Sequence, residues 1–115
     1  LILWLIFRGG VYNKKAITYR YVSLLSTSIR KPLNVYHTQN VFSNYKSWTD
    51  SKKQYANIAV PITLVYGEYD WSSPRERGES RALLRPQNYV ELEDTGHFSI
   101  LEAPEKAANI IKSHG

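Results

Sequence analysis

Two residues of this chain, Asp70 and His97, are of the types that perform acid and base chemistry, and each follows a run of residues typical of a strand. A histidine has an unperturbed pKa of about 6.5, so it can take a proton from a nucleophile or a water molecule and return it to a leaving group. A carboxylate on the other ring nitrogen fixes the tautomer and stabilises the imidazolium. Asp70 and His97 are therefore candidates for such a catalytic pair.

The element that must position Asp70 is the run from Pro61 to Tyr66, which is short, apolar and rich in β-branched and aromatic residues. This pattern predicts a strand that is buried on both faces of a parallel sheet and stops at Gly67. Asp70 would then lie just beyond the carboxyl end of a buried strand. Open α/β sheets bind their ligands at that place.

A helix and a second strand are predicted between the two candidates. Ser73 as N-cap, Pro74 at the first helical position and Glu76 three residues after the cap indicate a helix start. We expect this helix to run to about Leu84. Alternation of apolar and polar residues over positions 89–93 predicts a strand near a sheet edge, followed by a turn at 94–96 that leads into His97.

A last helix is predicted from Pro104 and Glu105 onward. Its apolar residues recur at helical spacing, so they can form one packing face. The residues of this face are Ala107, Ala108, Ile110 and Ile111.

This order of motifs resembles the C-terminal part of an α/β-hydrolase. The resemblance rests on Gly67-Glu68-x-Asp70, Gly96-His97-Phe98 and Glu102-x-Pro104-Glu105, and it covers roughly the last half of the chain. In that fold the catalytic residues follow the chain order nucleophile, acid, base, each on a loop after a strand. The resemblance implies that Asp70 is the acid and His97 the base.

The neighbours of the pair have roles under the same resemblance. Gly96 would allow the tight backbone approach that aims the imidazole ring, and Phe98 would pack beneath the ring and help to bind substrate. Trp71 follows Asp70 directly, and the sequence leaves open whether it lines the substrate pocket or wedges the loop.

The nucleophile that such a pair needs has no match in this sequence. The family places it before the acid, in a Gly-x-Ser-x-Gly elbow between a strand and a helix. The nearest run, Gly78-Glu79-Ser80-Arg81-Ala82, follows Asp70 and lies inside the helix predicted from Pro74, so we interpret Ser80 as a helix residue. Because the chain also contains no Met, we expect a fragment without turnover of its own, whose nucleophile and oxyanion hole lie upstream.

We expect two parts: a helical, lid-like segment over residues 1–56 and the C-terminal part of the hydrolase core over residues 57–115. In the first part, apolar periodicity predicts a helix that is capped by Asn13 and stopped by Pro32. Two shorter helices are predicted over residues 34–45 and 48–55. A role of Tyr19 or Tyr21 as an acid toward an epoxide oxygen is conceivable, but packing is the commoner role of such residues.

The charge of this 115-residue chain, formally +5, is unevenly distributed. Residues 1–60 hold nine Lys or Arg against one acid, whereas residues 61–115 hold six against nine. The basic first part could contact phosphate or anionic lipid. Because its bases are scattered, we favour a solvated lid and expect no nucleic acid partner and no stable membrane insertion.

Cofactors are not indicated. The chain has no Cys, which excludes disulfides and thiolate metal sites, and it has no cluster of His and carboxylates at metal-ligand spacing. We expect a small-molecule substrate and a cytoplasmic location, and the oligomeric state stays open.

Three functions are compatible with these observations. We favour a serine hydrolase that acts on an ester or similar acyl substrate. With an Asp nucleophile, the same fold would be an epoxide hydrolase or a haloalkane dehalogenase. The third is a non-catalytic binding module whose basic lid contacts an anionic partner.

Overall fold

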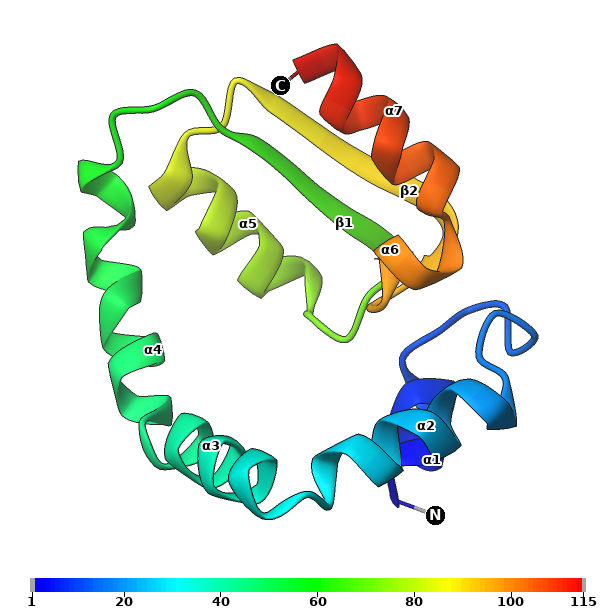
Figure 1. Ribbon diagram of the computed structural model, residues 1–115. Coiled ribbons are helices and arrows are strands. Elements are labelled where there is room, and N and C mark those ends of the chain that lie inside the picture. The colour runs from blue at the N-terminus through cyan, green and yellow to red at the C-terminus, as the bar shows by residue number, and fades with distance from the viewer. Residues whose placement is uncertain (1, 115) are drawn as a thin grey trace.

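A computed structural model describes residues 2–114 and shows helices arranged around a two-stranded parallel sheet (Figure 1). The chain is therefore a mixed α/β structure, as its pattern predicts. Its elements in chain order are α1 (Ile2–Gly9), α2 (Tyr19–Ile29), α3 (Pro32–Ser43), α4 (Tyr45–Ser51), the 3-10 helix η1 (Lys52–Asn57), β1 (Thr63–Tyr69), α5 (Pro74–Leu84), β2 (Asn88–Gly96), α6 (Ser99–Glu102) and α7 (Pro104–His114).

The predicted parallel pairing is confirmed, but β1 differs from the prediction in length and burial. It continues through Gly67 to Tyr69, and within it Gly67 alone is buried, while the apolar residues before it are half-buried. In a two-stranded sheet each strand has a hydrogen-bonded neighbour on one side only, so within residues 2–114 the other edge of β1 is unpaired. A Cβ on Gly67 would collide with the carbonyl groups of Thr95 and Gly96, and a glycine is therefore required there.

β2 is also longer than predicted, because the expected turn at residues 94–96 stays in the strand. The pairing shifts its register between Gly67 and Tyr69, and Tyr69 then pairs with Gly96. Asp94 has a φ of 53°, a left-handed conformation that the irregular pairing accommodates at this point. The two strands therefore end level with each other.

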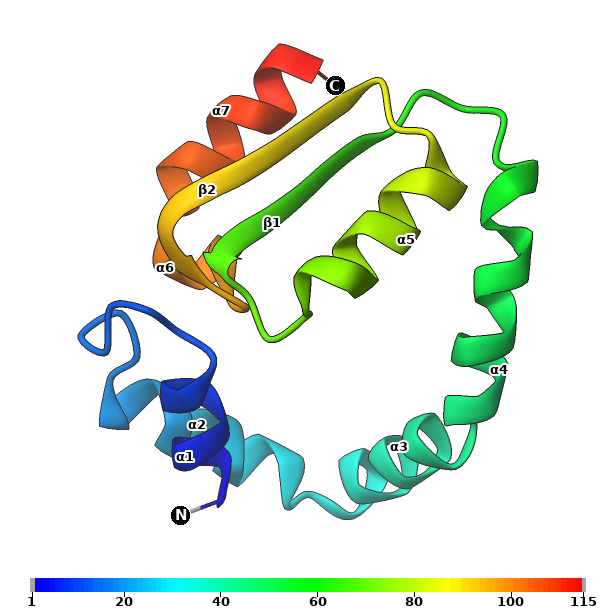
Figure 2. The same ribbon diagram turned by 180° about the vertical axis from the view of Figure 1, so that it is seen from behind.

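α5 forms as predicted, from Pro74 to Leu84. The Ser73 hydroxyl accepts the Glu76 backbone N–H, and the Glu76 carboxylate accepts the Ser73 backbone N–H, which completes a capping box. Arg77 ties the helix to β2 through an ion pair with Glu91 of 3.1 Å. Figures 1 and 2 show α5 beside β1 and α7 beside β2.

The first long helix starts later than predicted. The N-cap of α2 is Thr18, whose side chain accepts the Tyr21 backbone N–H, and not Asn13. Asn13 instead caps a local turn, since its side chain accepts the Lys15 backbone N–H. Pro32 does end the preceding helix, but it also occupies the first turn of α3, where its missing N–H costs nothing.

The helices after α2 lead away from the sheet in an arc and return at the amino end of β1 (Figure 2). The radius of gyration is 16.1 Å, whereas a compact domain of this length has about 13 Å. None of the residues of α3 or α4 is buried. The arc closes on α5 through a contact of η1, where Lys52 lies 3.4 Å from Glu79.

The buried core lies where α1 and α2 meet. It contains Val11, Ile17 and Val22, and side chains of α1 and the ring of Phe98 pack against it. In α7 the predicted packing face is only half realised, because Ala107 and Ile110 are half-buried while Ala108 and Ile111 are exposed. The core thus joins the first helices to the segment that carries His97.

The capping box makes a prediction about stability. Replacing Ser73 by Ala removes the acceptor of the Glu76 N–H, and we expect a loss of about 1 kcal/mol in the free energy of unfolding. Urea unfolding followed by circular dichroism measures it. Ser80→Ala, in the middle of α5, is the matched control and should cost less. Equal losses in the two variants would contradict the role of the cap.

Candidate active site

Asp70 and His97 lie next to each other because they are the next residues after a paired position. Tyr69 pairs with Gly96, so each candidate follows the end of its own strand at the same edge of the sheet. The His97 Nδ1 atom is 3.0 Å from the Asp70 Oδ2 atom. The Asp70 side chain is 9% exposed and that of His97 is 42% exposed. The carboxylate is thus sheltered, while the imidazole remains accessible.

A second hydrogen-bonding residue, Ser72, determines the state of Asp70. The other carboxylate oxygen, Oδ1, accepts the Ser72 backbone N–H at 2.7 Å and the Ser72 hydroxyl at 2.6 Å. Burial raises the pKa of Asp70, but the hydrogen bonds from Ser72 and His97 outweigh burial and hold this pKa below its ordinary value. Asp70 is therefore ionised at neutral pH, and the Nδ1–H of His97 can donate to it.

Aromatic side chains surround the imidazole. The Trp71 ring stacks on the His97 ring with centroids 4.4 Å apart and an angle of 17°, and Phe98 meets the imidazole edge-on at 5.2 Å. The Trp71 indole N–H donates to the Gly9 carbonyl at 3.3 Å. Trp71 thus both flanks the imidazole and ties its loop to α1, while substrate contact of Trp71 and Phe98 stays a prediction.

The glycine-containing segment after α1 packs against this site. A Cβ on Gly10 would collide with the rings of Phe98 and Trp71, and a Cβ on Gly96 would collide with the Gly10 carbonyl group and Val11. The Phe98 backbone N–H donates to the Gly10 carbonyl at 3.1 Å. The run Arg8-Gly9-Gly10 is not among the site residues that the sequence predicts, so this contact was missed.

Two further residues of the site were also missed. The Glu102 carboxylate accepts backbone N–H groups of Gly96, Tyr12 and Asn13. Sequence reasoning placed Glu102 in a motif without giving it a function, whereas Ser72 was not singled out at all. For Ser72 a signal existed, since a serine two residues after an aspartate is typical of an Asx turn.

The remaining candidates lie in helices. Ser80 is in α5, as interpreted from the sequence. Tyr21 packs edge-on against Phe7 at 5.8 Å and Tyr19 against Trp4 at 6.0 Å, which fits packing roles. Within residues 2–114 no three His, Asp or Glu side chains come together as a metal site would require.

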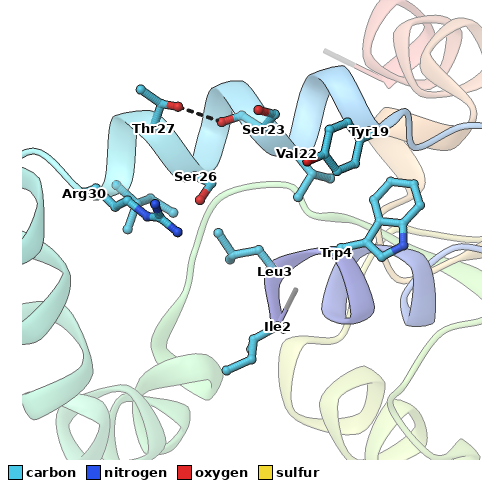
Figure 3. A pocket seen from close by; sticks show the side chains of 10 residues that line it. Ile2, Leu3, Trp4, Tyr19, Val22, Ser23, Ser26, Thr27 and Arg30 are labelled. Carbon is cyan, nitrogen blue, oxygen red and sulfur yellow. Dashed lines mark hydrogen bonds between the residues drawn. The ribbon is translucent and has the colours of Figure 1, made fainter.

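A separate hollow of about 950 Å³ lies between α1 and α2, and Figure 3 shows the side chains that line it. Its walls are formed by residues of α1, of α2 and of the C-cap of α2: Ile2, Leu3, Trp4, Tyr19, Val22, Ser23, Ser26, Thr27, Ile29 and Arg30. Asp70 and His97 do not line it. We place the candidate site at the pair because the titratable groups are there and the hollow has no such constellation.

The chain matches no protein-family model, no curated protein and no solved structure. Among the helices between Ile2 and His114, none combines the length and the apolar character that a bilayer crossing requires. A functional assignment therefore depends on the geometry of the site.

The hydrogen bonds of Ser72 make a prediction about pH. Ser72→Ala removes the hydroxyl bond, so we expect the pKa of Asp70 to rise. Because the native pKa is lowered, Asp70 stabilises the fold above its unfolded pKa, and this contribution is lost as the pH falls through the native pKa. Ser72→Ala should lose part of this stabilisation by Asp70. A carboxyl carbon NMR titration measures the shift, with Ser113→Ala in α7 as control; an unchanged midpoint would contradict the prediction.

Proposed function

We propose that this chain is the C-terminal part of an α/β-hydrolase and that it provides the acid and the base of a catalytic triad. The observation that carries the proposal is the contact of 3.0 Å between Asp70 Oδ2 and His97 Nδ1 at the ends of two parallel strands. Fold alone does not imply function. The proposal is supported by the order of the two residues along the chain, acid before base, which is the order of that family.

The proposed reaction is the hydrolysis of an ester or a similar acyl compound. His97 Nε2 takes the proton of a serine hydroxyl supplied by an upstream part of the protein, and the serine oxygen forms a bond to the acyl carbon. The protonated His97 then gives this proton to the leaving alkoxide as the bond to it breaks. In the second half of the reaction His97 takes a proton from a water molecule, whose oxygen forms a bond to the acyl carbon. The bond to the serine oxygen then breaks, and His97 returns the proton to the serine as the carboxylic acid is released.

The residues of this chain have distinct tasks in that reaction. Asp70 stays ionised, holds the Nδ1–H tautomer of His97 and stabilises the imidazolium. Its lowered pKa suits this task, because protonation would remove the acceptor. Trp71 stacks on the ring and limits its rotation. The His97 side chain is 42% exposed, which leaves room for a nucleophile to approach it.

The proposal is tested by sequencing the reading frame upstream of Leu1 and expressing the longer protein. We expect a strand, a Gly-x-Ser-x-Gly elbow and a helix, and a longer protein that reacts with a fluorophosphonate probe. His97→Ala should slow this labelling by at least about a thousandfold, because the serine then lacks its base. His37→Ala, in α3, is the control.

Two results would decide against a serine hydrolase. An upstream frame without any elbow, or labelling that is as fast in His97→Ala as in the unchanged protein, removes its basis. An Asp at the elbow would redirect the assay to epoxides and haloalkanes, where the same pair would activate a water molecule.

A second candidate function is reversible binding to an anionic membrane surface by residues 19–57, which comprise α2 and the helical arc that follows it. The observation that favours it is the combination of exposed large apolar side chains with an excess of positive charge. Six Lys or Arg stand against Asp50 in this segment. The most exposed apolar residues are Tyr19, Leu24, Leu33, Tyr36, Phe42 and Tyr45. Such a composition is typical of segments that lie in the membrane interface.

This candidate has its own test, which is sedimentation of the chain with vesicles. We expect binding to vesicles rich in phosphatidylserine at low salt and none to neutral vesicles. Lys31→Gln combined with Lys46→Gln should weaken it at least about tenfold, whereas Lys106→Gln with Lys112→Gln in α7 should not. Vesicle binding that changes neither with the salt concentration nor with these substitutions would rule out electrostatic binding by this segment.

A further inference from the structure

The Glu102 carboxylate gathers backbone N–H groups from two distant segments. Oε2 accepts the N–H of Gly96 at 2.7 Å and that of Tyr12 at 3.1 Å, and Oε1 accepts the N–H of Asn13. Glu102 belongs to the short helix α6, which directly follows the His97 loop. Hydrogen bonds to an ionised acceptor are about twice as strong as neutral ones. One side chain therefore joins the loop after α1 to the end of β2.

The backbone is held on both sides of His97. The residue before it, Gly96, donates to Glu102, and the residue after it, Phe98, donates to the Gly10 carbonyl. Gly96 is so close to the Gly10 and Val11 backbone that no side chain would fit there. The contacts enclose His97 between two fixed peptide groups.

This matters because the stacking of Trp71 limits the rotation of the ring but does not fix the backbone that carries it. The His97 side chain is 42% exposed, and its hydrogen bond to Asp70 restrains one of its nitrogens. A displacement of about 1 Å at a catalytic group can cost about a hundredfold in rate. The position of the ring thus depends on the backbone from which it projects.

We infer that Glu102 is the positioning residue of His97: by binding the Gly96, Tyr12 and Asn13 amides it holds the imidazole in line with Asp70. The inference rests on the proposed function, since positioning has a purpose only if His97 acts as a base. Glu102 does not touch the ring, so it acts through the backbone. It also makes the segment after α1 a part of the site.

The test is nitrogen-15 NMR of the 115-residue chain, with Glu102→Gln and Glu102→Ala and with Glu105→Gln as the control. Glu105 lies three residues later, in the first turn of α7. In the unchanged chain we expect the His97 ring to be protonated at Nδ1. In both Glu102 variants the Nδ1-protonated fraction should fall toward that of a free imidazole. The Gly96, Tyr12 and Asn13 amide protons should shift upfield, and the control should change neither signal.

The outcomes separate the two proposals. If the unchanged chain lacks the Nδ1-protonated ring, the catalytic pair itself is wrong and the proposed function fails. If the ring is Nδ1-protonated in the unchanged chain and stays so in the variants while the amides shift, Glu102 is only a loop staple and the inference is overturned. Global unfolding of both variants with a folded control also overturns it, because Glu102 would then support the whole fold.

Discussion

The pairing of Tyr69 with Gly96 is the constraint on which the candidate site depends. Two parallel strands that end level place their next residues side by side, and here those residues are Asp70 and His97. The level ends require the register shift after Gly67, where the approach of the Thr95 and Gly96 carbonyls leaves no room for a side chain. A larger residue at position 67 would move the strands apart and separate the pair.

Around this pairing, the site is assembled from segments that are distant in the chain. The loop after β1 contributes Asp70 with its Ser72 partner, and the loop after β2 contributes His97. The end of α1 and the residue after it hold both loops, because the Gly9 carbonyl accepts the Trp71 indole N–H and the Gly10 carbonyl accepts the Phe98 backbone N–H. The bonds from Ser72 satisfy the sheltered Asp70 carboxylate, which would otherwise be costly to bury. The same bonds that fold these loops also set the ionisation of Asp70 and the orientation of its partner.

The helical arc, in contrast to the site, is stabilised by little burial of apolar side chains. Burying a large apolar side chain contributes about 1.5–3 kcal/mol to the free energy of folding. The helices α3 and α4 gain little from this effect, because none of their residues is buried. Segments with few buried apolar contacts open at low free-energy cost. Exposed apolar surface of this extent is also typical of surfaces that contact another partner. The arc is therefore the part of the described chain that should open at the lowest free-energy cost.

The sequence by itself determined the local elements and the two candidate residues. The capping box at Ser73 and the apolar run before Gly67 carry their signals within a few neighbouring positions, so α5 and β1 could be predicted, although the strand ends could not. Asp70 and His97 could be singled out by residue type and by their place after strands. What the sequence did not reveal depends on long-range contacts: the register shift that levels the strands, the approach of Gly10, and the bonds of Glu102 to residues about ninety positions away. Tertiary structure alone decides these, because a backbone amide has no residue-specific signal and its partner is whichever acceptor folding brings to it.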